Sequence, residues 1–160
     1  MIETQVTETR WLTTTEQRAW RAFMVGQQRL LDQLNRQLQR DADLTLAEYR
    51  ILVLLSESPG QSLRMSDLAD GVLSSRSRLT HQIRRMEDQG LVRRESCAED
   101  GRGVLAHLTE RGLTKLKDSA PGHVASVRQH FFDLVDEQEI GVLAEVFSRI
   151  VDDQDDAADG

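Results

Sequence analysis

The feature that most restricts the fold of this chain is the stretch 65–112, where two short helical patterns are followed by a hairpin signal. The first pattern covers 65–71 and has the apolar spacing of a short scaffold helix. After a tight turn, the hydroxyl of Ser74 or Ser75 can cap a second helix that runs to Gln89. Two helices joined by such a turn predict a helix-turn-helix unit.

The second helix has two contrasting faces. Leu79, Ile83 and Met86 recur at helical spacing and predict a buried stripe. The opposite face then carries a row of hydrogen-bond donors. They are Arg76, Ser77, Thr80, His81 and Arg84, with Arg78 and Arg85 on the flanks. Such a helix fits the DNA major groove, where arginine binds guanine edges or phosphates and the smaller side chains bind either. We expect the first four to contact base edges, and Arg84 and Arg85 to contact phosphates.

The distribution of charge favours DNA over the alternative of a merely solvated helix face, the usual place of charged side chains. Residues 74–94 contain six arginines and two acidic residues, a balance of +4. The whole chain carries −7, so the remainder carries −11. An acidic protein that concentrates positive charge on one helix and the following strand separates its surfaces by electrostatic role.

A hairpin follows the helix. The strand-like runs 91–97 and 104–108 flank an Asp-Gly pair, a strong turn signal. We expect Arg102 at the tip to enter the minor groove, and Asp100 to orient it through a carboxylate–guanidinium hydrogen bond. An ordinary hairpin with a surface ion pair is the alternative. A winged helix that binds protein would need neither a braced tip arginine nor the donor row.

These residues resemble the MarR family of bacterial transcriptional regulators, from about Thr13 to Val151. The most specific part is the wing motif, formed by Asp100, Arg102, Leu108, Thr109 and Gly112. The stretches 75–80 and 86–92 also look like the family's recognition helix and its exit. The resemblance implies a homodimer that binds double-stranded DNA at a pseudo-palindromic operator, often as a repressor. It also implies release of DNA when a small ligand binds or a thiol is oxidised.

The expected fold is mainly α with a small β-hairpin wing, as a single domain. Capping boxes at Thr13–Glu16 and Thr45–Glu48 open two helices. We expect Pro121 to kink or interrupt the last long helical stretch. The domain divides into dimerisation helices over 13–40 and 109–151, a winged helix-turn-helix lobe over 45–108, and an acidic disordered tail over 152–160.

The flanking helices carry apolar stripes that one winged domain cannot cover. Pairing them across a two-fold axis would bury these stripes. Two recognition helices would then enter successive major grooves about 10 bp apart, so the operator should be an inverted repeat.

A ligand site is expected only from the resemblance, since members of the family bind phenolic or other aromatic acids between the dimerisation helices and the DNA-binding lobe. By position, the wall residues would be Trp20, Phe23, Met24 and Met65. The alternative for each is simple core packing.

Other classes of function lack their residues. There is no phosphate loop, activated nucleophile or carboxylate pair, which argues against an enzyme. The four histidines show no metal spacing, and no cofactor is expected. The single cysteine, Cys97, has acidic neighbours that would raise its thiol pKa and oppose a redox switch. Without a signal peptide or an apolar run of about 20 residues, the expected location is cytoplasmic, with no membrane contact.

Overall fold

The computed structural model describes residues 9–96 and 103–158, which are mainly helical with one small antiparallel sheet, as the sequence predicts. The elements in chain order are α1 (Thr14–Ala42), α2 (Leu46–Glu57), η1 (Pro59–Gln61), β1 (Ser62–Arg64), α3 (Met65–Gly71), α4 (Arg76–Asp88), β2 (Val92–Ser96), β3 (Val104–Leu108), α5 (Glu110–His130), η2 (Phe132–Leu134) and α6 (Glu137–Ala158).

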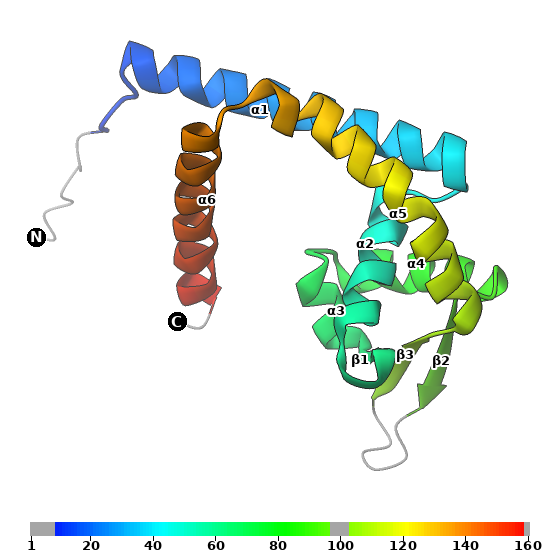
Figure 1. Ribbon diagram of the computed structural model, residues 1–160. Helices are drawn as coiled ribbons and strands as arrows, with labels where there is room; N and C mark the ends of the chain where they lie inside the picture. Colours follow the sequence, from blue (N-terminus) through cyan, green and yellow to red (C-terminus); the bar gives the residue numbers. More distant parts are fainter. Residues whose placement is uncertain (1–8, 97–102, 159–160) are drawn as a thin grey trace, which may run out of the picture.

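The helices form an arm and a lobe (Figure 1). α1 and α5 pack along each other and make the arm, while α2, α3, α4 and the sheet make a lobe at one end of it. α6 branches from the other end of the arm, where Phe147 contacts Phe23 of α1 with ring centroids 5.6 Å apart. The sheet has the order β1-β3-β2. The lobe therefore has the winged helix-turn-helix arrangement.

A single apolar core holds the lobe on the arm. Its fully buried members include Leu38 of α1, Leu44, Ile51, Leu52 and Leu55 around α2, Leu68 of α3, and Leu79, Ile83 and Met86 of α4. The predicted inward stripe of the second helix is therefore confirmed. Because these residues come from four helices, the core holds α4 within the lobe, packed on α3 and β2, and leaves its opposite face at the surface.

Local capping signals set where the helices begin and end. Both capping boxes are present, at Thr13–Glu16 and at Thr45–Glu48. Ser75 rather than Ser74 caps α4, and its side chain accepts the backbone N–H of Arg78 at 3.3 Å. Gly90 closes the far end with a φ of 73°, a conformation that favours glycine.

The wing is tied to the lobe through the turn that precedes α5. The Thr109 hydroxyl donates to the carbonyl oxygens of Gly90 at 2.7 Å and Leu91 at 3.0 Å. The same hydroxyl accepts the backbone N–H of Gly112 at 3.0 Å and so caps α5. Gly112 lies so close to the Leu91 carbonyl that a Cβ would overlap it. The Leu-Thr-x-x-Gly sequence therefore joins the exit of α4 to the start of α5.

The structure differs from the sequence-based expectations in two places and adds one strand. Pro121 does not interrupt α5, because packing against α1 and α2 outweighs the lost backbone donor. α6 reaches Ala158, so 152–158 are helical rather than a disordered tail; extending a formed helix costs much less than nucleating one. The short β1, which pairs with β3, was not anticipated, because its three residues carry no periodic signal.

Candidate DNA-binding site

The outward face of α4 presents the predicted donor row. Arg76, Ser77, His81 and Arg84 are exposed, and Thr80 is half-buried. The Thr80 hydroxyl donates to the carbonyl oxygen of Arg76 at 2.8 Å, which leaves its oxygen able to accept. Ser75, also predicted to bind DNA, lies at the exposed start of the helix as its cap. The structure thus brings these six residues onto one surface.

The arginines of α4 differ in what they contact. Among the described residues, Arg76, Arg78 and Arg84 have no acidic side chain within 4.0 Å, so their charges face solvent without a neutralising partner. Arg85 was predicted to contact phosphate with Arg84, but its Nε lies 3.2 Å from the carboxylate of Glu48 on α2. The structure therefore gives Arg85 a partner inside the protein.

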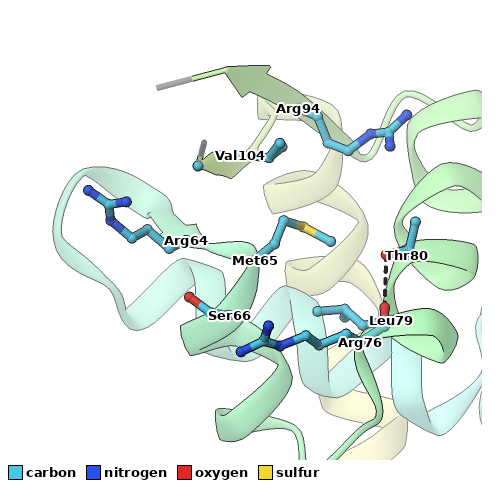
Figure 2. Close-up of a pocket in the computed structure, with 9 residues that line it drawn as sticks. Arg64, Met65, Ser66, Arg76, Leu79, Thr80, Arg94 and Val104 are labelled. Carbon is cyan, nitrogen blue, oxygen red and sulfur yellow. Dashed lines mark hydrogen bonds between the residues drawn. The ribbon is translucent and has the colours of Figure 1, made fainter. Parts of the chain in front are cut away.

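A hollow of about 530 Å³ opens beside the donor row, between α3, α4 and the base of the wing (Figure 2). It is lined by Arg64, Met65 and Ser66 around the start of α3, Arg76, Leu79 and Thr80 of α4, and Arg94, Gly103 and Val104 of the wing. Three arginines from separate elements thus surround one concave surface, a suitable arrangement for a phosphate backbone.

Sequence reasoning did not identify Arg64 as a site residue. It ends β1, directly before α3, and reaches the hollow from the side opposite Arg94 (Figure 2). A basic residue immediately before the scaffold helix was the available signal, but only the fold shows that this position borders the hollow.

Arg94 is held in a fixed orientation by Glu87. Its guanidinium donates to one Glu87 oxygen from Nε at 2.9 Å, and its backbone N–H donates to the other oxygen at 2.9 Å. The backbone N–H of Arg94, followed by its side chain, lowers the pKa of Glu87 below its usual value. This pair joins the end of α4 to the first wing strand.

The wing strands form as predicted, but its tip lies outside the described residues. β2 and β3 pair antiparallel from Val92↔Leu108 to Ser96↔Val104. The predicted minor-groove residue Arg102, its partner Asp100, and Cys97 all belong to the undescribed stretch 97–102. Their roles stay predictions.

The four residues expected to line a ligand cleft do not share one site. Trp20, Phe23 and Met24 lie in the first half of α1, with the Trp20 and Phe23 ring centroids 5.8 Å apart. Met65 does not lie in the arm with them; it lies in the lobe, at the hollow beside the donor row. The grouping was based on position in the sequence, and the length of α1 separates its members.

Over 9–96 and 103–158, no three His, Cys, Asp or Glu side chains gather as metal ligands. No helix within those ranges is long and apolar enough to cross a membrane.

Comparisons with known proteins identify the family. A family model described as the MarR family matches residues 42–103, which include the recognition helix and the first wing strand. The transcriptional regulator HosA of Escherichia coli O127:H6 is 31% identical over 113 residues, which are 68% of this chain and 76% of HosA. The chain belongs to the MarR family.

Solved structures of MarR-family proteins agree over nearly the full length. AbsC of Streptomyces coelicolor is 49% identical, with a TM-score of 0.85 over 91% of this chain and 98% of AbsC. Sco3205 of the same organism, solved in complex with DNA, is 44% identical, with a TM-score of 0.87 over 91% of each chain. This MarR-family chain is therefore a DNA-binding transcriptional regulator with a winged helix-turn-helix fold. Its relatives are regulators rather than enzymes.

Proposed function

We propose that this protein binds an inverted-repeat operator in double-stranded DNA as a homodimer and represses transcription from the promoter that the operator overlaps. The observation that carries the proposal is the outward face of α4, where exposed donors lie beside Arg76, Arg78 and Arg84, for which the described residues provide no acidic partner. In a major groove, Arg76, Ser77, Thr80 and His81 would contact base edges and Arg84 would contact phosphate.

The hollow beside α4 supports the same docking. With Arg64 and Arg94 on its rim, it would accept the phosphate backbone that borders the groove. Under this proposal, the wing would extend along the duplex from β2 and β3, with Arg102 in the minor groove and Asp100 orienting it.

The proposed dimer rests on apolar side chains that a single subunit leaves exposed. They lie on the first half of α1 and along α6, and include Trp20, Val25, Val142, Phe147 and Ile150. No residue of α6 with a described side chain is buried within the subunit. An apolar face of this extent marks a protein contact, and a second copy related by a two-fold axis would cover it.

The operator binding can be tested by selecting duplexes from a random pool and titrating the winner against an unrelated duplex at two salt concentrations. The proposal predicts a sequence with two related half-sites about 10 bp apart. It also predicts affinity that falls steeply with salt, because neutralised phosphates release counterions. Equal affinity for both duplexes would refute specific binding, and a reporter that stays active when the operator is occupied would refute repression.

We also propose a small phenolic or aromatic acid as the effector that releases the DNA. Trp20, Phe23 and Met24 supply apolar surface for an aromatic ring on α1, opposite Phe147 of α6. Such a ligand must bind more tightly to a dimer whose recognition helices are wrongly spaced for DNA. A screen for acids that release the operator and quench tryptophan fluorescence tests this. If Trp20→Ala leaves the release unchanged, the site is elsewhere.

A further inference from the structure

Glu48 is a buried carboxylate that connects two helices. It lies in the first turn of α2, and its side chain is only 2% exposed. A carboxylate buried to this extent is costly unless it is paired and hydrogen-bonded. One oxygen, Oε2, accepts the backbone N–H of Thr45 at 2.8 Å, and the other, Oε1, lies 3.2 Å from Nε of Arg85 on α4. Glu48 thus joins the N-terminus of α2 to the last turn of the recognition helix.

The same end of α2 is also bonded to the arm. The backbone N–H of Leu46 donates to Oδ1 of Asn35 on α1 at 2.9 Å. Polar contacts therefore run from α1, through the first turn of α2, to α4; we refer to them as the Asn35–Glu48–Arg85 chain. Because Ile51 and Leu52 of α2 are fully buried, the middle member of this chain is held by the core.

Arg85 differs from the other arginines on its helix. Within the described ranges, Arg76, Arg78 and Arg84 have no acidic partner, whereas the Nε of Arg85 lies 3.2 Å from Oε1 of Glu48. A guanidinium held by a buried carboxylate fixes the rotation of the helix that carries it. If the Arg85 guanidinium turned to a phosphate instead, the Glu48 carboxylate would stay buried without a charged partner, which is costly.

We propose that Arg85 is a positioning residue, and that the Asn35–Glu48–Arg85 chain sets the orientation of the recognition helix relative to the dimerisation arm. The proposal rests on the proposed function, since orientation matters only if two helices must fit two half-sites. Loss of the chain should weaken binding to the operator more than binding to unrelated DNA, because non-specific binding depends on phosphate attraction.

The test compares Glu48→Gln, Arg85→Gln and the double variant, with Arg84→Gln as the matched control on the same helix. Gln at position 48 can still accept the Thr45 N–H but has no charge for Arg85. Each single variant should lower operator affinity about tenfold, and the double variant should lose no more, since both act through one contact. For these variants, the slope of log affinity against log salt concentration (the salt slope) should stay at the wild-type value. Arg84→Gln should flatten the slope by about 1.8 per dimer, because two phosphate contacts are lost at about 0.9 each.

The opposite pattern would overturn the proposal. If Arg85→Gln flattens the slope as Arg84→Gln does, and its loss adds to that of Glu48→Gln, Arg85 is a phosphate contact. Circular dichroism checks the helicity of every variant, and sedimentation checks its dimer mass. If Glu48→Gln misfolds, the test rests on the salt dependence of Arg85→Gln, a substitution at a half-exposed side chain that the fold should tolerate. Asn35→Ala should also lose operator affinity at unchanged slope, and wild-type binding would exclude the arm from the chain. If the wild type itself does not prefer its selected duplex, the proposed function fails before any variant is compared.

Discussion

Replacing Gly112 by alanine should destabilise this protein strongly, because the added Cβ has no space. It would overlap the Leu91 carbonyl oxygen and approach the carbonyl carbon to 3.0 Å and Cδ1 of Leu108 to 2.7 Å. Two of these three atoms are backbone and cannot rotate away. Overpacking costs about 1–3 kcal/mol, and moving Leu91 would also weaken the hydrogen bond from Thr109, worth about 1 kcal/mol. The free energy of unfolding should therefore fall by about 3 kcal/mol.

Gly141→Ala is the matched control, since the same methyl group has nothing within 4 Å at this position of α6. Alanine is favoured over glycine inside a helix by about 0.5–1 kcal/mol, so this variant should gain stability. Urea unfolding of both variants and the wild type, at one protein concentration, measures the two changes. Equal stability of Gly112→Ala and wild type would refute the close approach of α5 to Leu91.

Three further perturbations test other parts of the structure. Ser75→Ala removes the cap of α4 and should lower the free energy of unfolding by about 1 kcal/mol; an unchanged urea midpoint would contradict the cap. Burial lowers the pKa of His123, whose ring lies 4.4 Å from that of Tyr49. Just below pH 6.5 the His123 ring is therefore protonated in the unfolded chain but not in the folded one. The free energy of unfolding should fall as the pH drops below about 6.5, and this fall should be smaller in His123→Gln. Identical pH slopes would exclude His123. Phe147→Asp should shift sedimentation from dimer to monomer, and an unchanged dimer would place α6 outside the interface.

Local signals in the sequence were sufficient for the recognition helix and its surroundings. The serine cap and the spacing of Leu79, Ile83 and Met86 each depend on residues within a few positions of one another. Helix periodicity then determined which side chains face outward. The exposed donor row could be predicted for the same reason.

Contacts between distant segments could not be predicted in this way. Spacing places Arg84 on the outward face and Arg85 on its flank, and both were expected to contact phosphate; only the tertiary fold gives Arg85 a buried partner in Glu48. Pro121 illustrates the opposite case, in which a strong local signal for a break is overridden by the packing of α5 against α1 and α2. Tertiary contacts therefore decided the points at which sequence and structure differ.

In the proposed complex, two copies of α4 occupy successive major grooves of one operator. Dimethyl sulfate protection of the selected duplex tests it directly, because the reagent methylates guanine N7 in the major groove and adenine N3 in the minor groove. Bound protein should protect guanine N7 in two patches about 10 bp apart, one in each half-site. Unprotected N7 positions, or a single protected patch, would contradict it.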